Sequence, residues 1–297
     1  MPPEVIAVFG PTASGKTAVA EALADGLGTE VVSSDAMQVY EGLPILTNQP
    51  DRPTRLVAVW ALSHEGSVGE YQRLAHAAID ELVAANCTAV VAGGTGLYLR
   101  AALAELDLPP APGEGARARW QAAYDEDANA VFAELERRDP AAAALVHRND
   151  RRRVVRALEL AEAGSSLAPA ESRLWSGETR RPTLVVGLDV PKAELDRRIE
   201  ERTWEMFRQG VVDEVRTALR NGNVSRTAAK TLGLTEISQL PADEAREHIV
   251  LRTRRYAAYQ RKWMRRIPGI VMIDAGAASP RPPMEVAGEI LEVARAR

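Results

Sequence analysis

Residues 10–17 carry a phosphate-binding pattern near the start of the chain. They read Gly10-Pro11-Thr12-Ala13-Ser14-Gly15-Lys16-Thr17 and match G-x-x-x-x-G-K-[ST]. In this pattern the backbone amides and the positive end of the following helix point at phosphate oxygens, and the lysine adds a positive charge. The threonine hydroxyl is a ligand for Mg²⁺, so we expect Mg²⁺ as the cofactor, held by Thr17. The loop is therefore predicted to bind a phosphate chain.

The segments around this loop must hold it between a strand and a helix. Residues 5–9 form an apolar run typical of a buried strand, and residues 18–24 carry strong helix formers at helical spacing. Further strands are expected at 30–35, 88–92, 183–190 and 270–273, and helices at 69–85, 151–163, 192–220 and 242–267. The alternation predicts an α/β protein with a P-loop NTPase-like parallel sheet flanked by helices.

Two further loops are expected at the same edge of this sheet. Asp35 ends one predicted strand, and the turn Gly93-Gly94-Thr95-Gly96 follows another. Because ligands gather at the carboxyl ends of parallel strands, we expect both to converge on the phosphate loop. Asp35, one strand over from the loop, is the best-placed general base, and a turn cap is its alternative role. The strand at 88–92 ends in glycines where an ATPase normally has an acidic residue, which weakens a motor or switch interpretation.

A stretch rich in proline and glycine at residues 109–115 interrupts the alternation of strands and helices. Helical segments follow at 116–127 and 130–146. We therefore divide the chain into a P-loop α/β core at residues 1–111 and 149–297 and a helical insertion at residues 112–148.

Composition points to a reducing compartment. Cys87 is the only cysteine in 297 residues, so no intrachain disulfide is possible. The chain starts close to its first strand, without a charged and then apolar leader, and no segment approaches the length of a membrane span. We expect a soluble cytoplasmic protein with no membrane partner. The histidines are scattered and show no metal-ligand spacing.

Basic residues cluster in two places although the formal net charge is −4. The first group is Arg151, Arg152, Arg153 and Arg156, and the second is Arg252, Arg254, Arg255, Arg261, Lys262, Arg265 and Arg266. Tyr256, Tyr259 and Trp263 are interleaved with the second group. Such a helix can bind RNA phosphates and offer stacking surfaces. The alternative is a solvated face whose aromatic residues pack into the core, and for Tyr256 and Trp263 the two interpretations stay equally open.

Several ordered blocks together resemble the tRNA dimethylallyltransferases. They are GPTASGKT at 10–17, SDAMQVY at 34–40, GGTGLY at 93–98, DRRRVVRALE at 150–159, the segment 202–215 with Met206, Gly210, Glu214 and Val215, and TRRYA at 253–257 with Gln260 and Trp263. The resemblance spans nearly the whole chain. It implies transfer of a dimethylallyl group from dimethylallyl diphosphate to the N6 amine of the adenosine 3′-adjacent to the anticodon in tRNA, with release of diphosphate.

The chemistry of that reaction gives the residues their expected roles. The adenine amine must lose a proton as it attacks, so Asp35 is the expected base, while the phosphate loop and Mg²⁺ stabilise the leaving diphosphate and Thr17 takes part as metal ligand. Gln38 offers a donor and an acceptor to an adenine edge. By resemblance, Arg202 helps to hold the diphosphate. The predicted contacts with the tRNA anticodon loop are Asp35, Ala36, Met37, Gln38, Thr95 and Arg117, together with the insertion, and the protein is expected to act as a monomer.

The chain departs from the family pattern in four places. Leu46-Thr47-Asn48-Gln49-Pro50 stands where members commonly read G-T-A-K-P, and Ala58-Val59-Trp60 where a paired histidine segment is expected. Gly233-Leu234 replaces a glycine-tyrosine pair and Ala258-Tyr259 a lysine-arginine pair. These changes bear on which tRNAs are modified.

Three alternatives stay open. A small-molecule kinase would use the loop for ATP and Asp35 to activate a hydroxyl. An adenylate prenyltransferase would act on a free nucleotide, whereas the insertion and the basic helix favour a polymer. An RNA-binding protein without activity would be expected to have lost Lys16, Thr17 or Asp35, and all three are present.

Overall fold

The computed structural model describes residues 2–106, 108, 113, 115–168, 177–276 and 281–297. It divides into two compact units, Met1–Leu106 with Leu174–Arg297, and Asp107–Arg173. The predicted boundary stretch at 109–115 lies largely outside the described residues. None of the helices in the described ranges is both long and apolar enough to cross a membrane.

The first unit is built on a five-stranded parallel sheet in the order β2-β3-β1-β4-β5. The strands are β1 (Val5–Phe9), β2 (Val31–Ser33), β3 (Ala89–Gly93), β4 (Thr183–Asp189) and β5 (Val271–Asp274). The central strand β1 pairs with β3 and β4, so that Val5 lies opposite both Ala89 and Thr183. Every residue of β1 and β3 is buried, which explains their continuous apolar runs. The predicted α/β class with a parallel sheet is confirmed.

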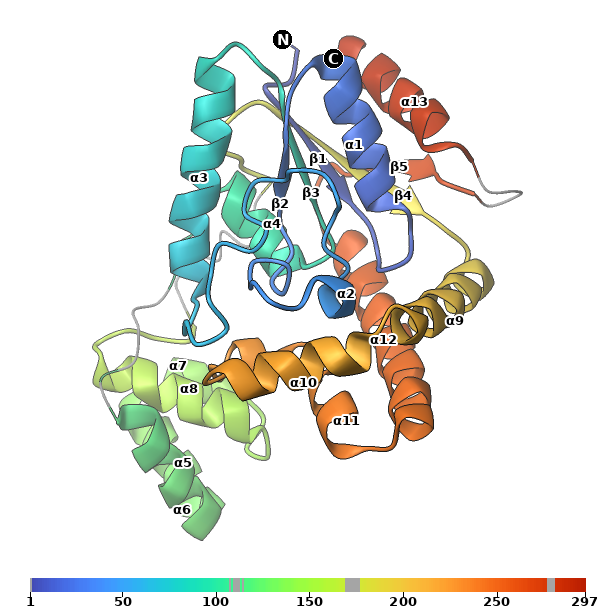
Figure 1. Ribbon diagram of the computed structural model, residues 1–297. Helices are drawn as coiled ribbons and strands as arrows, with labels where there is room; N and C mark the ends of the chain where they lie inside the picture. Colours follow the sequence, from blue (N-terminus) through green and yellow to red (C-terminus); the bar gives the residue numbers. More distant parts are fainter. Residues whose placement is uncertain (1, 107, 109–112, 114, 169–176, 277–280) are drawn as a thin grey trace. The chain divides into compact units, whose positions relative to one another are not determined.

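Helices cover both faces of this sheet (Figure 1). The helices α1 (Lys16–Leu27) and α13 (Pro283–Arg295) pack together on one face, and α3 (Val68–Ala84) and α4 (Gly96–Leu103) pack together on the other. A core of almost fully buried side chains joins the sheet to α1 and α13; it includes Ile6, Val8, Leu23, Leu184 and Ile290. This packing fixes the strand ends from which the functional loops emerge.

A second group of helices packs next to the carboxyl ends of the strands (Figure 1). They are α9 (Lys192–Arg208), α10 (Val211–Asn221), the 3₁₀ turn η2 (Ala228–Lys230), α11 (Leu234–Gln239) and α12 (Ala242–Met264), with the short α2 (Pro44–Thr47) against α10. Their shared core includes Leu43, Leu46, Met206, Val215 and Ile249. The sequence predicted a single helix over 192–220, and this was wrong. The chain breaks at Gly210, whose φ of +92° is a left-handed conformation that glycine adopts without strain.

The second unit is an all-helical bundle with a core of its own. It consists of α5 (Ala116–Glu126), α6 (Ala128–Arg138), α7 (Pro140–Leu145) and α8 (Arg151–Glu162). Its core includes Val131, Phe132, Leu135, Val154 and Leu158. The unit is longer than the insertion predicted at 112–148, because the apolar face of α8 packs against α5 and α6 instead of joining the α/β core.

Candidate active site at the phosphate loop

The phosphate loop links β1 to α1. Gly15 caps the helix with a φ of +85°, and Ala13 also has a positive φ, of 64°. A side chain at Gly10 would place its Cβ 2.5 Å from the Ser14 hydroxyl oxygen, so the loop is tightly curled there. The motif thus forms the strand, loop and helix arrangement that the sequence predicted, and α1 begins at Lys16.

Lys16 is partly buried, and its ammonium group is directed at its own loop. Its Nζ lies 3.5 Å from the carbonyl oxygen of Pro11, to which it donates. Burial lowers the pKa of Lys16 to about 8; the Asp35 carboxylate opposes that shift and the Arg202 guanidinium adds to it. An anion bound nearby would favour the charged form of the lysine. Lys16 is therefore suited to bind an anion whose charge compensates for its burial.

Arg202 of α9 is a second cation at the loop. Its Nη1 donates a 3.0 Å hydrogen bond to the Thr12 hydroxyl, and burial lowers its pKa while Asp35 raises it. The Nε of Arg202 and the hydroxyl of Ser14 are buried, and neither has a hydrogen-bond partner within the described residues. Buried polar atoms are nearly always paired. Both donors are thus well suited to the oxygens of a phosphate group.

Asp35 caps a turn, which is one of the two roles that the sequence left open, and its role as general base stays a prediction. Its Oδ1 accepts hydrogen bonds from the backbone N–H of Met37, at 2.9 Å, and of Gln38, at 3.4 Å, and so caps a turn. The side chain also lines a cavity together with Lys16 and Arg202. Asp35 is two strands from the loop and not one, because β3 lies between β1 and β2. Strand order cannot be derived from the order of the chain, which explains the error.

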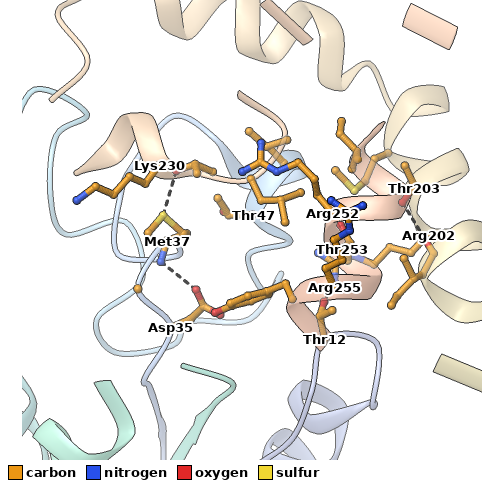
Figure 2. Close-up of a pocket in the computed structure, with 18 residues that line it drawn as sticks. Thr12, Asp35, Met37, Thr47, Arg202, Thr203, Lys230, Arg252, Thr253 and Arg255 are labelled. Carbon is orange, nitrogen blue, oxygen red and sulfur yellow. Dashed lines mark hydrogen bonds between the residues drawn. The ribbon is translucent and has the colours of Figure 1, made fainter. Parts of the chain in front are cut away.

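A cavity of about 410 Å³ opens beside Thr12, Asp35 and Arg202. Figure 2 shows Asp35 and Met37 on one side of it and Arg202, Arg252 and Arg255 on the other. Part of its wall is apolar and is formed by Ala36, Met37, Leu46, Ile199, Met206, Leu232 and Ile249. The polar part includes Thr47, Thr203, Lys230, Thr231, Thr253 and Tyr256. A second cavity of about 380 Å³ lies over the phosphate loop and shares Thr12, Asp35, Thr47, Arg202 and Tyr256 with the first. The phosphate loop therefore adjoins a space that suits an apolar group.

Gln38 lines the second cavity, but its amide is already engaged. Its Nε2 donates to the carbonyl oxygens of Asn48, at 2.7 Å, and Thr47, at 3.4 Å, and its Oε1 accepts from the Ser33 hydroxyl at 3.0 Å. Both amide hydrogens thus have partners inside the chain, and one lone pair of Oε1 is left for a ligand. The predicted contact between Gln38 and an adenine edge stays a prediction.

Thr95 brings the third predicted loop to the site. Its hydroxyl lies 3.1 Å from the hydroxyl of Tyr256, which lines both cavities. Burial, with a contribution from Asp35, raises the pKa of Tyr256 to about 12, so the phenol is neutral. Thr95 and Tyr256 therefore form a neutral hydrogen-bonded pair beside the carboxylate.

Arg117 belongs to the second unit. Its Nε and Nη2 donate to Glu159 at 2.6 and 3.0 Å, and Arg156 donates to the same carboxylate at 3.1 Å. Glu159 is only 1% exposed. A buried carboxylate requires such partners, so Arg117 has a structural role in this bundle. Its predicted contact with tRNA stays a prediction.

The surroundings of Thr17 fit a Mg²⁺ ion that is coordinated mainly by substrate phosphates and water. Among the described residues, no group of three or more His, Cys, Asp or Glu side chains is arranged to hold a metal. Mg²⁺ is commonly held by one or two protein ligands together with substrate phosphates and water. Thr17, beside Lys16 in the wall of the second cavity, suits that mode.

Glu214 is a site residue to which sequence reasoning assigned no role. Its two carboxylate oxygens accept from the backbone N–H groups of Ile45, at 2.7 Å, and Leu46, at 2.8 Å. Burial raises its pKa. Because these contacts hold the first turn of α2, Glu214 positions Leu46 and Thr47 in the cavity wall.

Arg198 is another residue of the second cavity that the sequence analysis missed. It lies one helical turn before Arg202, and this spacing was a usable signal.

Gly93 allows β3 to approach the turn that carries Asp35. A Cβ at Gly93 would lie 2.2 Å from the Ser34 hydroxyl oxygen and 2.5 Å from the Ser34 carbonyl oxygen. We expect Gly93→Ala to lower the free energy of unfolding by about 1–3 kcal/mol, because backbone must move to make room. Urea denaturation measures this. Gly288→Ala, on an exposed position of α13 with nothing within 4 Å of the new Cβ, is the control and should stabilise the protein slightly. Equal stabilities for the two variants would contradict the expectation.

Comparisons with known proteins agree over most of the chain. The family model described as IPP transferase matches residues 38–267, and the model described as Isopentenyl transferase matches residues 3–54. A protein of Thermobifida fusca named tRNA dimethylallyltransferase is 41% identical over 287 residues, which are 90% of this chain and 88% of that protein. A protein of Mycobacterium tuberculosis with the same name is 39% identical, covering 92% of this chain and 93% of its own length.

Solved structures also match. The tRNA isopentenylpyrophosphate transferase of Bacillus halodurans has a TM-score of 0.68 at 28% identity and covers 98% of this chain and 97% of its own. A eukaryotic dimethylallyltransferase described as acting on tRNA has a TM-score of 0.76 at 24% identity, covering 91% of this chain and 73% of its own. This second likeness concerns the fold alone.

Proposed function

The chain belongs to the IPP transferase family, and from this membership we propose that it is a tRNA dimethylallyltransferase. It transfers the dimethylallyl group of dimethylallyl diphosphate to the N6 amine of the adenosine 3′-adjacent to the anticodon. The bond between N6 and C1 of the prenyl group forms, and the bond between C1 and the bridging oxygen breaks. The proton of N6 goes to Asp35, and the electron pair of the broken bond leaves with diphosphate.

The phosphate loop holds the leaving group in this proposal. The loop amides, Lys16 and Arg202 face the charge that develops on diphosphate, and stabilising such charge in a desolvated site is usually a large contribution to catalysis. The Ser14 hydroxyl and the Nε of Arg202 supply two buried donors for its oxygens. Mg²⁺, held by Thr17 and the diphosphate, would supply further charge neutralisation. The apolar wall around Met37, Leu46 and Met206 excludes water from the prenyl group.

The acceptor enters from the cationic side of the larger cavity. Arg252 and Arg255 lie there, opposite Asp35 (Figure 2). An adenine in an anticodon loop can be drawn out of its stack at modest cost because the loop is single-stranded. Thr95, Ala36, Met37 and Gln38 are the proposed contacts of that base, and Arg117 and the insertion at 112–148 the proposed contacts of the remaining loop. We propose that the protein is a monomer that acts on tRNA in the cytoplasm.

One observation carries the proposal: Asp35, the two cations Lys16 and Arg202, and an apolar wall meet across two adjacent cavities. The test is transfer of radiolabel from dimethylallyl diphosphate to bulk tRNA in the presence of Mg²⁺. Parallel reactions contain free adenosine phosphates in place of tRNA, or labelled ATP with small nucleosides. Label in tRNA alone supports the proposal. Label in free adenylate would establish the adenylate prenyltransferase, and turnover of ATP without prenyl transfer would establish the kinase.

A further inference from the structure

The inner face of α12 touches two of the loops at the phosphate site, the phosphate loop itself and the turn at residues 93–96. Tyr256, Gln260 and Trp263 lie at positions i, i+4 and i+7 and therefore on one face of the helix. Tyr256 meets Thr95, and Trp263 packs so closely on Gly96 that a Cβ there would lie 2.1 Å from its indole ring. Gln260 lies between them. The helix that carries the basic residues thus faces the loops with its aromatic and amide side chains.

Gln260 joins two loops through one side-chain amide. Its Oε1 accepts a 2.8 Å hydrogen bond from the backbone N–H of Thr12, and its Nε2 donates a 2.9 Å bond to the carbonyl oxygen of Gly94. The side chain is 2% exposed. Gly94 has no room for a Cβ, which would lie 2.3 Å from the Nε2 of Gln260. Among side chains, only Asn and Gln present an acceptor and a fixed pair of amide donors in one planar group, and the bridge uses both functions.

Thr12 connects the Gln260 bridge to the cation Arg202. The Thr12 backbone is held by Gln260, and the Thr12 hydroxyl accepts the hydrogen bond from Nη1 of Arg202. Thr12 and Arg202 line both cavities. Moving the first turn of the phosphate loop therefore also moves the contact that orients a buried guanidinium.

We propose that Gln260 is a positioning residue for diphosphate binding: it fixes the phosphate loop at Thr12 and, through Thr12, orients Arg202 toward the diphosphate. The inference rests on the proposed function, in which diphosphate is the group that the loop holds. Gln260 also lines the second cavity, and its proposed effect on diphosphate binding runs through its hydrogen bond to Thr12. It also makes the shape of the anion site depend on the position of the basic helix.

The first test is Gln260→Met, which keeps the length of the side chain and removes both hydrogen bonds. We expect the Kd for inorganic diphosphate with Mg²⁺, measured by calorimetry, to rise about tenfold, the factor expected for a buried hydrogen-bond contribution. In transfer assays the KM for dimethylallyl diphosphate should rise similarly while the KM for tRNA stays constant. The control is Gln72→Met, because Gln72 also uses both functions of its amide, in bonds of 3.4 and 3.5 Å to the backbone of Leu106, away from the loop.

A second variant separates positioning from loss of stability. In Gln260→Glu a deprotonated carboxylate faces the Gly94 carbonyl without a proton to donate, whereas the protonated form can restore both hydrogen bonds. The ratio of its Kd for diphosphate to that of the wild type should therefore fall toward one as the pH is lowered. The ratio for Gln260→Met should not depend on pH. Because each ratio compares the variant with the wild type at the same pH, the effect of protonating diphosphate itself cancels.

The outcomes distinguish the two proposals. If wild type and Gln260→Met bind inorganic diphosphate equally well, or if the Gln260→Glu ratio is independent of pH, the positioning role is wrong. If the wild type binds diphosphate but transfers no label to tRNA, the proposed function is wrong, and the comparison of Kd values still tests Gln260. A higher Kd for diphosphate in Gln260→Met, together with a wild-type Kd in Gln72→Met, supports the inference.

Discussion

Asp35→Asn is expected to reduce the rate of prenyl transfer to tRNA by about 10²–10⁴-fold, the range for removal of a general base. Asparagine keeps a side-chain oxygen, so the hydrogen bonds from the N–H groups of Met37 and Gln38 and the turn itself should persist. What is lost is the group that takes the N6 proton. Single-turnover transfer of labelled prenyl group with saturating tRNA measures the chemical step.

Binding of diphosphate serves as the internal control for this variant. The negative charge of Asp35 repels a bound anion, so replacing Asp35 by Asn should leave the affinity for inorganic diphosphate unchanged or increase it. Asp189→Asn is the matched control, because Asp189 also ends a parallel strand and lines neither of the two cavities. Transfer by Asp35→Asn at the wild-type rate would exclude Asp35 as the base.

Lys16→Met is expected to weaken diphosphate binding by about 10–100-fold near neutral pH, as for the loss of a charge-assisted hydrogen bond. The effect should depend on pH. The pKa of Lys16 is lowered to about 8, so the free protein carries the charge below that pH and loses it as the pH rises further. The ratio of variant to wild-type Kd should therefore be largest below pH 8 and decrease above it. Calorimetric titration with inorganic diphosphate across this range measures the ratio.

Lys192→Met is the control for Lys16. The Lys192 ammonium group lies at the start of α9, its side chain is 75% exposed, and it pairs with Asp196. Its removal should leave diphosphate binding unchanged at every pH. A Kd ratio for Lys16→Met that stays at one from pH 6 to pH 10 would show that the charge of Lys16 does not contribute to binding.

The sheet was largely predictable because its inner strands, such as β1 and β3, are buried on both faces. Such strands read as continuous apolar runs, and the run at residues 5–9 coincides with β1 (Val5–Phe9). The phosphate loop was predictable because its geometry depends on residues that are adjacent in the sequence. Helix breaks and short helices were harder to predict from the sequence. The break at Gly210 requires only one residue with positive φ, and α2 has a single turn.

Contacts between distant segments were beyond the reach of the sequence. Thr12 and Gln260 are 248 residues apart, and Ile45 and Glu214 are 169 residues apart. Both pairs depend on strand order and helix packing, which a single sequence does not reveal. The aromatic residues on α12 differ in their surroundings, and contact of Tyr256 or Trp263 with RNA stays a prediction. Trp263 packs against Gly96 and Tyr256 bonds Thr95, whereas Tyr259 is 56% exposed and available for stacking.

Two of the departures from the family pattern lie in contact. Leu46 and Leu234 belong to one core, and a Cβ at Gly233 would lie 2.7 Å from Cδ1 of Leu46. A change of side chain at one position therefore alters the space available at the other. Gln49 is engaged elsewhere, because its amide donates to the carbonyl oxygens of Tyr40, at 2.7 Å, and Gln38, at 3.2 Å. Residues 46–50 thus contribute to the cavity wall and to the turn of Asp35.

The basic side chains of α12 differ in what they can contribute to RNA binding. Arg252 pairs with Glu236, Arg254 with Glu200, and Arg261 with Asp189. Within the described residues, Arg255, Lys262 and Arg265 form no ion pair. A cation that is already paired with a carboxylate must give up that partner before it can neutralise a phosphate, so the unpaired cations are expected to contribute most to counterion release. At about 0.7–0.9 ions per phosphate contact, those three side chains account for a slope of about −2 to −3 in a plot of log K against log salt concentration. Tight binding of tRNA by this helix would therefore persist at salt concentrations that release a protein with a fully unpaired basic face.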